Sequence, residues 1–226
     1  MENSTTQKLA LFDLDNTLLN GDSDHAWGEF LISRGLVDAD QHRARNDFFY
    51  EQYKRGVLDI HGYVAFTLDS VRHLSADELQ GLHGEFMREL VSPMMLKKSL
   101  ELVNAHKKAG DYCVIITATN EFITTPIAKL FGIDHLLPTE LETVNGKYTG
   151  KISGIPCYQD GKVEKLSQWL EGFDGKLSLS NSIFYSDSKN DLPLLQAVEV
   201  AVAVDPDDEL RSFAEQSNWG IISLRD

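Results

Sequence analysis

The sequence has few cysteines and no long hydrophobic run. Its two cysteines, Cys113 and Cys157, show neither a CxxC pattern nor the spacing of a metal site, so we expect free thiols and a reducing, cytoplasmic setting. No stretch approaches the roughly 18 consecutive apolar residues of a membrane helix. The first residues are polar and contain no basic segment followed by an apolar run. We therefore expect neither secretion nor a membrane span.

Basic residues are also scarce. The chain has 21 Lys and Arg against 35 Asp and Glu, which gives a formal net charge of −14. Because affinity for a phosphate backbone depends on clustered Lys and Arg, we expect no nucleic-acid partner. A small anionic substrate would need a metal ion and a local lysine to balance its charge.

Residues 21–91 carry helical patterns throughout, and no β-rich run interrupts them. Ser75 followed by Glu78 is typical of a capping box that begins a helix. With 226 residues, of which 42% are hydrophobic, the chain is long enough for one core and a smaller module. We predict a core formed by 1–20 and 92–226, with an all-helical cap inserted after the first strand. Apolar residues at helical spacing include Ile60, Val64, Leu68 and Val71.

From residue 96 onward, helical and β-rich segments alternate. A helical pattern over 96–109 ends at Gly110, and the β-rich run 112–116 follows it. Such alternation is typical of a Rossmann-like, three-layer α/β fold around a parallel sheet. Further strands are expected at 9–12, 135–137, 182–186, 199–204 and 220–222, a helix over 162–170, and a hairpin over 141–152 around Asn145 and Gly146.

Acidic residues follow two of the expected strands. Asp13 and Asp15 come directly after the first strand, and Asp187 and Asp191 come after the strand over 182–186. In open α/β sheets, ligands bind at the carboxyl ends of the strands. Mg²⁺ prefers carboxylate oxygens and often binds through one or two of them together with a substrate phosphate. The arrangement therefore predicts a Mg²⁺ site and phosphoryl chemistry.

Four motifs in this order resemble those of the haloacid dehalogenase superfamily of phosphohydrolases. The first motif of that superfamily, DxDxT, is matched by Asp13, Asp15 and Thr17, and the last, DxxxD, by Asp187 and Asp191. Between them, Thr117 and Lys162 match the threonine and lysine motifs. The match spans essentially the whole chain. The resemblance implies an α/β core with an inserted cap and a phosphatase activity.

Each motif alone also has a structural interpretation. An aspartate pair after a strand can form a turn, and the last acidic pair can cap a helix. Thr117 can be a β-branched strand residue, and Lys162 can be a solvated residue on a helix. The four motifs together, in the expected order, favour a phosphoryl-transfer site.

The resemblance implies a role for each matching residue. Asp13 would be the nucleophile that forms an aspartyl phosphate, and Asp15 the general acid and base. An aspartate at position 15 argues against carbon–halogen cleavage, because the dehalogenases of the superfamily generally lack it. Mg²⁺ would be held by the Asp13 side chain, the Asp15 main-chain carbonyl and Asp187.

Other residues would bind the phosphate or support the metal site. Thr117, with backbone N–H groups from Ala118 onward, would accept the phosphate oxygens. Lys162 would bridge the nucleophile and the phosphate. Lys151 and Lys165 are rivals for this role; the first follows the hairpin, and the second lies a turn further into the helix. Asn190 and Asp191 would support the metal site.

The helical cap resembles that of the subgroup that contains phosphoserine phosphatase. Asp22 occupies the position of an acidic residue that grips the substrate amino group in those enzymes, although it could equally cap the first helix. Those enzymes also bind the substrate carboxylate through a cap arginine, and none of Arg43, Arg45, Arg55 or Arg72 can be matched to it.

These features predict a Mg²⁺-dependent phosphomonoesterase that acts on a small-molecule phosphate ester. Amino-alcohol or amino-acid phosphates, such as histidinol phosphate or phosphoserine, are the candidate substrates. A phosphotransferase that passes the phosphoryl group from Asp13 to a second alcohol is an alternative. A phosphate-binding module without catalysis is a third, but it would be expected to lack Asp13, Asp15 or Asp187, and all three are present.

Overall fold

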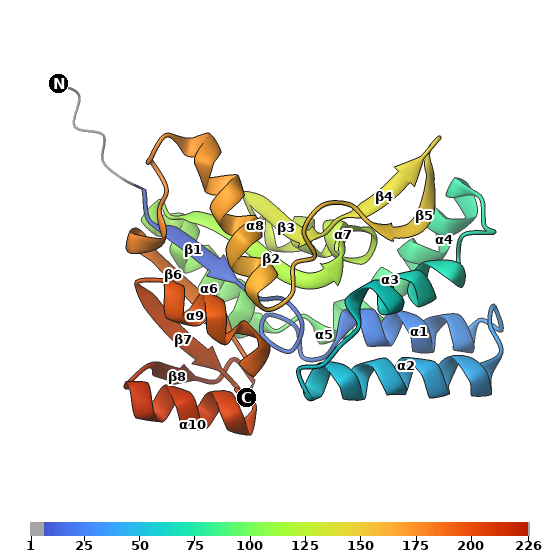
Figure 1. Ribbon diagram of the computed structural model, residues 1–226, viewed down its shortest axis with the longest axis horizontal. Coiled ribbons are helices and arrows are strands. Elements are labelled where there is room, and N and C mark those ends of the chain that lie inside the picture. Colours follow the sequence, from blue (N-terminus) through green and yellow to red (C-terminus); the bar gives the residue numbers. More distant parts are fainter. Residues whose placement is uncertain (1–6, 226) are drawn as a thin grey trace.

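The computed structural model describes residues 7–225, and its centre is a six-stranded parallel sheet (Figure 1). The strand order is β3-β2-β1-β6-β7-β8, so the first strand of the chain lies in the middle of the sheet. This confirms the predicted Rossmann-like fold. The strands are β1 (Leu9–Phe12), β2 (Tyr112–Asn120), β3 (His135–Thr139), β6 (Ser182–Ser186), β7 (Val200–Val204) and β8 (Gly220–Ile222).

Helices cover both faces of the sheet, which explains why the strands are almost continuously apolar. Along β1, Leu9 and Leu11 pack on one side and Ala10 and Phe12 on the other, and all four are fully buried. The first side is covered by α8 (Asp160–Leu170), α9 (Leu192–Ala197) and α10 (Asp208–Ser217), and the second by α6 (Lys97–Ala109) and α7 (Glu121–Phe131) (Figure 1).

Every described element between residues 21 and 91 is helical, as expected. The predicted capping box is present, because Ser75 and Glu78 exchange hydrogen bonds at the start of α4. The division of the chain into 1–20, 92–226 and 21–91 stays a prediction. The helices are α1 (Ser23–Ser33), α2 (Ala39–Lys54), α3 (Ile60–Asp69) and α4 (Ala76–Phe86), followed by a π-helical turn (Met87–Val91) and α5 (Ser92–Met94).

Three boundaries refine the sequence-based expectations. Strand β2 continues past Thr117 to Asn120, with an irregular register against β3 after Ile116. Helix α8 begins at Asp160, so Lys162 already lies in its first turn. The hairpin is present as β4 (Leu141–Val144) and β5 (Lys147–Ile152), and both turn residues have positive φ, as a tight two-residue hairpin turn requires. Short 3₁₀ turns occupy Glu171–Phe173, Leu179–Asn181 and Lys189–Asp191.

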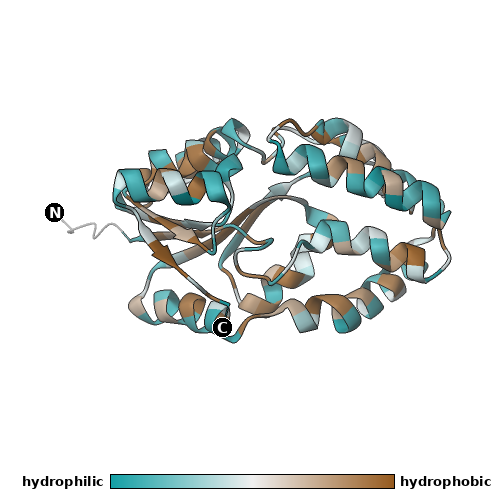
Figure 2. Cartoon of the chain, turned by 90° about the horizontal axis from the view of Figure 1, so that it is seen from below, coloured by the Kyte–Doolittle hydropathy of each residue, from teal (hydrophilic) through white to brown (hydrophobic). Residues whose placement is uncertain are grey.

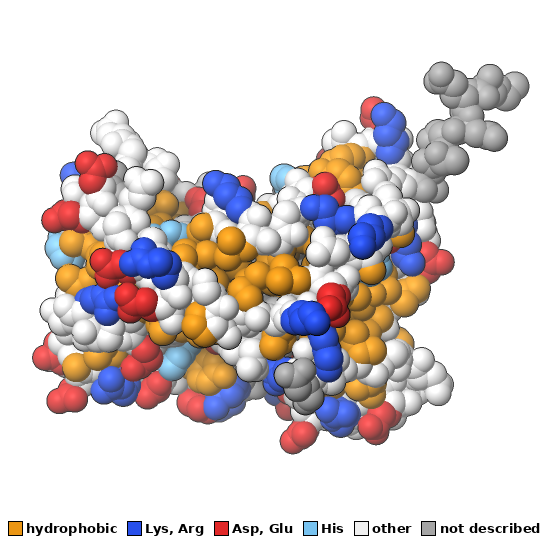
Figure 3. Space-filling view, turned by 180° about the vertical axis from the view of Figure 1, so that it is seen from behind, with side chains coloured by type: hydrophobic (Ala, Val, Ile, Leu, Met, Phe, Trp, Pro, Cys, Tyr) orange, Lys and Arg blue, Asp and Glu red, His pale blue; other side chains and the backbone are white. Residues whose placement is uncertain are grey.

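Hydrophobic residues concentrate in the strands and on the helix faces turned toward them (Figure 2). On the face opposite that of Figure 1, acidic and basic side chains lie close to one another around a central group of hydrophobic ones (Figure 3). Within residues 7–225, no helix combines the length and apolar character needed to cross a membrane.

Candidate active site

Lys162 lies between two carboxylates at the carboxyl edge of the sheet. Its Nζ is 2.8 Å from Asp13 Oδ1 and 2.7 Å from the Asp191 carboxylate, and all three side chains are almost fully buried. The Ser186 hydroxyl, at the end of β6, donates to Asp191 at 2.7 Å. Burial disfavours a charged lysine, but Asp13 and Asp191 raise the pKa of Lys162 overall, so it stays protonated.

The two rival lysines lie elsewhere. Lys165 Nζ is 2.9 Å from Glu140 and does not reach the acidic cluster, and Lys151 is exposed on β5. The first turn of α8 therefore brings Lys162, and not its neighbour one turn later, to the end of β1.

The Thr17 hydroxyl joins the first and last acidic motifs. It lies 3.2 Å from Asp13 Oδ2 and 2.9 Å from Asp187 Oδ1, and it accepts a hydrogen bond from the Asp187 backbone N–H at 3.0 Å. Thr17 is fully buried. The sequence motif included Thr17 without giving it a role. The structure shows that it fixes the distance between two strand ends that are far apart in the chain.

The Asp15 carboxylate is held by two donors. The Ser23 backbone N–H donates to Oδ1 at 2.6 Å, and the Thr119 hydroxyl donates to Oδ2 at 2.8 Å. Burial, together with the nearby charge of Asp22, raises the pKa of Asp15 to about 6 in spite of these donors. A carboxyl group with such a pKa can both donate and accept a proton near neutral pH.

Burial raises the pKa values of Asp13 and Asp187 as well. For Asp13, the charge of Lys162 opposes the effect of burial, and for Asp187 the charge of Asp13 adds to it. Carboxylates crowded in this way attract a cation or protons.

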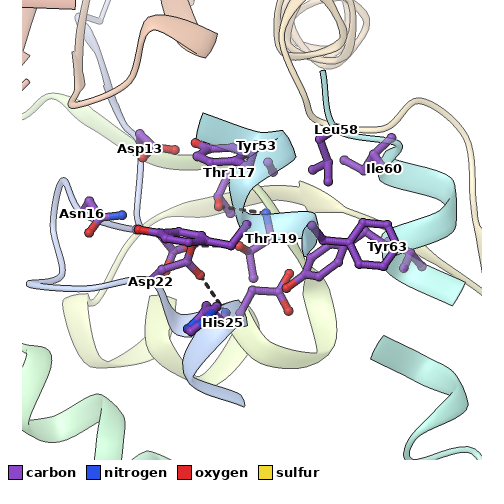
Figure 4. Close-up of a pocket in the computed structure, with 16 residues that line it drawn as sticks. Asp13, Asn16, Asp22, His25, Tyr53, Leu58, Ile60, Tyr63, Thr117 and Thr119 are labelled. Carbon is purple, nitrogen blue, oxygen red and sulfur yellow. Dashed lines mark hydrogen bonds between the residues drawn. The ribbon is translucent and has the colours of Figure 1, made fainter. Parts of the chain in front are cut away.

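Thr117 lies in the same pocket as Asp13 (Figure 4), and Ala118 also lines this pocket. The Thr117 Oγ1 accepts a hydrogen bond from the Thr119 backbone N–H at 3.1 Å, within the last residues of β2. Helix α7 then begins after Asn120, whose side chain accepts from the Ile123 N–H. The arrangement places a hydroxyl group and the start of a helix next to the acidic strand ends, where they could bind an anion.

The donor set at this edge fits Mg²⁺ held in part by water and substrate. Within the described part of the chain, no three His, Cys, Asp or Glu side chains converge into a metal site of their own. Asp13 and Asp187, held together through Thr17, offer two hard carboxylates, and the Asp15 main-chain carbonyl is adjacent in the chain. Mg²⁺ commonly binds through one or two carboxylates and keeps several waters.

The pocket extends from the acidic strand ends into the helical segment. Asp22 caps α1 by accepting from the His25 backbone N–H at 2.8 Å, so its structural interpretation is confirmed. It also lines the pocket, and its role toward a substrate stays a prediction. The lining residues of the helical segment are Asp22, Asp24, His25, Phe49, Tyr50, Tyr53, Leu58, Ile60, Tyr63 and Val64 (Figure 4).

No arginine or lysine is among the described residues that line this pocket. Arg43 pairs with Glu29 at 3.2 Å, and Arg72 pairs with Asp69 at 2.8 Å. Arg45 lies over the Phe66 ring, 4.8 Å from its centroid. Arg55 follows α2 as its C-cap residue. None of these four arginines lines the pocket.

Asn190 connects the last acidic motif to the helical segment. Its side-chain amide donates to the Tyr53 carbonyl oxygen at 2.9 Å and accepts from Gln159 Nε2 at 3.3 Å. The Gln159 amide also donates to the Gly56 carbonyl oxygen at 3.0 Å, although Gln159 itself has a left-handed φ of 50°. Asn190 thus contacts the end of α2, and its support of the metal site stays a prediction. No pattern in the sequence indicates that Gln159 makes these contacts.

Known proteins resemble this chain over most of its length. The sequence model of the haloacid dehalogenase-like hydrolases matches residues 10–196. Histidinol-phosphatase of Neisseria meningitidis serogroup C (strain 8013) is 46% identical over 221 residues, covering 97% of this chain and 100% of that protein. Phosphoserine phosphatase SerB1 of Mycobacterium tuberculosis (strain ATCC 25618 / H37Rv) is 33% identical over 222 residues, covering 96% of this chain and 70% of that protein.

Two solved structures are also similar. A protein with unknown function from Bordetella pertussis Tohama I has a TM-score of 0.90 at 43% identity, covering 98% of this chain and 100% of that chain. A phospho-aspartyl intermediate analogue of phosphoserine phosphatase has a TM-score of 0.70 at 15% identity, covering 97% and 94%, and shows the likeness of fold alone. The family match and the identities of the relatives confirm the resemblance predicted from the motifs: this chain is an enzyme of the haloacid dehalogenase-like hydrolase family.

Proposed function

We propose that this hydrolase is a Mg²⁺-dependent phosphomonoesterase that works through an aspartyl phosphate on Asp13. The observation that carries the proposal is the position of the Asp13 carboxylate. One oxygen faces Lys162 Nζ at 2.8 Å, the other lies 3.2 Å from Thr17, and Asp13 lines the same pocket as Asp15 and Thr117.

In the first step, an Asp13 oxygen attacks phosphorus and the bond to the substrate alcohol breaks. Asp15 gives its proton to the leaving oxygen, which a pKa of about 6 permits. In the second step, Asp15 takes a proton from water as the water attacks the phosphorus, which releases phosphate and restores the Asp13 carboxylate.

Positive charge near the phosphate comes from two sources. Lys162, kept protonated between Asp13 and Asp191, would contact the phosphoryl oxygens together with Thr117 and the Ala118 N–H. The Asp13 and Asp187 side chains and the Asp15 carbonyl would hold Mg²⁺, which neutralises charge on the transferring group when bound.

We propose that the substrate is a small amino-alcohol phosphate such as histidinol phosphate. Asp22 and Asp24 give the substrate end of the pocket an acidic character, and no arginine or lysine among its described lining residues could bind a carboxylate. This disfavours phosphoserine. The 46% identity to the Neisseria histidinol-phosphatase supports the same assignment.

A cytoplasmic location is also proposed. Cys113 and Cys157 are buried free thiols, and burial raises the pKa of each to about 12, so neither is suited to disulfide exchange.

The test is phosphate release from histidinol phosphate, phosphoserine and p-nitrophenyl phosphate with Mg²⁺ and with EDTA. We expect Mg²⁺-dependent release, with the highest kcat/KM for histidinol phosphate and a much lower value for phosphoserine. Transfer of phosphate to an added alcohol, with little release to water, would instead indicate the phosphotransferase. No release from any ester would contradict the proposed function.

A further inference from the structure

Asp24 is a buried acidic residue that the proposed chemistry does not use. Its side chain is 8% exposed and lines the pocket, yet its Oδ1 has no hydrogen-bond donor in the described part of the chain. A buried acceptor without a partner is costly, and such atoms are uncommon in folded proteins. A carboxylate oxygen that lacks a donor, on a residue that lines the pocket, points to a donor on the ligand.

The other carboxylates of the pocket are already engaged. Asp13 faces Lys162, and both Asp15 oxygens accept hydrogen bonds, from Ser23 and Thr119. Asp22 uses one oxygen to cap α1. Asp24 differs from them because one of its oxygens is both buried and without a donor among the described residues.

The surroundings of Asp24 suit a flat ring. The Tyr63 hydroxyl interacts with the Asp24 carboxylate, and the rings of Tyr63 and Phe49 lie 5.3 Å apart at their centroids. Leu58 and Ile60 add apolar surface beside Tyr63 (Figure 4). A wholly apolar ligand would leave Asp24 unpaired, whereas a strongly hydrated cation would gain little from these aromatic and aliphatic walls.

We propose that Asp24, with Tyr63 and Phe49, forms a second subsite that accepts an N–H group of a nitrogen-containing aromatic ring on the substrate alcohol. This inference rests on the proposed function. It identifies the ring N–H of the substrate as the group that the helical segment recognises. Asp22 would face the amine nearer the phosphate. The substrate class is then a phosphate ester whose alcohol carries both an amine and an azole-type ring.

The test compares histidinol phosphate with phenylalaninol phosphate, which keeps the amino alcohol and an aromatic ring but lacks the ring nitrogens. We expect wild type to prefer histidinol phosphate by about 30-fold or more in kcat/KM, since sites built to bind a donor reject analogues that lack it. Asp24→Leu removes the acceptor, and the preference should fall below about threefold. Asp24→Asn keeps an acceptor oxygen and should retain an intermediate preference.

Far-UV circular dichroism and thermal unfolding of each Asp24 variant are the controls for folding, and the preference between the two esters is the readout. Equal use of the two esters by wild type would overturn the subsite while leaving the phosphatase assignment intact. If wild type hydrolyses neither ester, the proposed function fails. In that case, calorimetry compares the dissociation constants of histidinol and phenylalaninol for wild type. Equal constants would overturn the proposed subsite.

Discussion

The Lys162 ammonium lies 2.8 Å from Asp13 Oδ1, although the two residues are 149 positions apart in the chain. Asp191 lies on the other side of the same ammonium, at 2.7 Å. The contact requires that β1 and β6 are paired in the parallel sheet and that α8 begins at their carboxyl edge. The fold and the proposed chemistry therefore depend on the same buried group of three charges.

Replacing Lys162 by methionine should remove activity and destabilise the protein. Asp13 and Asp191 would then lie buried without their counter-charge, and breaking a buried ion pair from one side typically costs about 3–5 kcal/mol. We expect kcat/KM for the preferred ester to fall by at least about 10³-fold. Urea unfolding and phosphate release measure the two effects.

Lys165→Met is the matched control, one turn later on the same helix. Its partner Glu140 is half exposed, whereas both partners of Lys162 are buried, so the loss of Lys165 should destabilise the protein less. Activity should stay within about threefold of wild type. Equal losses in the two variants would contradict the special position of Lys162.

The Thr17 hydroxyl should control metal affinity. Thr17→Val keeps the side-chain shape but removes the contacts to Asp13 and Asp187, so the two carboxylates lose their fixed separation. We expect the Mg²⁺ concentration for half-maximal activity to rise about 10–100-fold, as for other residues that orient metal ligands. Thr17→Ser keeps the hydroxyl group and should stay close to wild type. Unchanged Mg²⁺ dependence in Thr17→Val would exclude this role.

In EDTA, the protein should become less stable as the pH rises from about 4 to 7. Burial raises the pKa of Asp15 from 3.8 to about 6. The folded state therefore binds a proton that the unfolded state has lost, and this stabilisation disappears as the pH passes the folded pKa. We expect a decrease of about 1–2 kcal/mol in the free energy of unfolding from this group.

Asp15→Asn removes the titrating group and should flatten this part of the pH profile. Thermal unfolding of the two proteins between pH 4 and about 8 gives the comparison. A wild-type stability that rises over this range, or an identical slope in Asp15→Asn, would show that Asp15 does not titrate as described.

The Asn190 amide should hold the helical segment over the site. Asn190→Ala removes the bond to the Tyr53 carbonyl oxygen and the contact with Gln159. We expect faster hydrogen exchange of the backbone amides at residues 53–58 and a KM raised about 3–10-fold, because the end of α2 would be held less firmly over the site. Gln216→Ala, on the exposed face of α10, is the control. If hydrogen exchange at residues 53–58 is the same in Asn190→Ala and wild type, this contact does not hold the end of α2 over the site.

The sequence was sufficient to predict the sheet and the acidic strand ends because both depend on local patterns. Apolar runs followed by Asp13 and Asp187 indicate buried strands whose carboxyl ends carry possible metal ligands. Asn145 with Gly146 indicates a hairpin. The end of β2 was placed too early. The polar residues after Thr117 resemble a loop, whereas the chain stays extended to Asn120 before α7 begins.

The substrate end of the pocket could not be predicted in the same way. Asp24 and Tyr63 belong to different helices, and no local pattern shows that they meet in one pocket with Asp13. Likewise, the sequence alone does not show that Arg43 and Arg72 form ion pairs with neighbouring acidic residues instead of lining the pocket. Such pairings depend on how the helices pack.

The most direct test of the central claim is to trap the phosphoenzyme. Wild type and Asp13→Asn are mixed with a radiolabelled ester in Mg²⁺ and quenched in acid, with Asp174→Asn, at an exposed turn, as the control. We predict label on the peptide that contains Asp13 in wild type and in Asp174→Asn, and none in Asp13→Asn, together with loss of phosphate release. Label on another residue, or full activity in Asp13→Asn, would contradict the account.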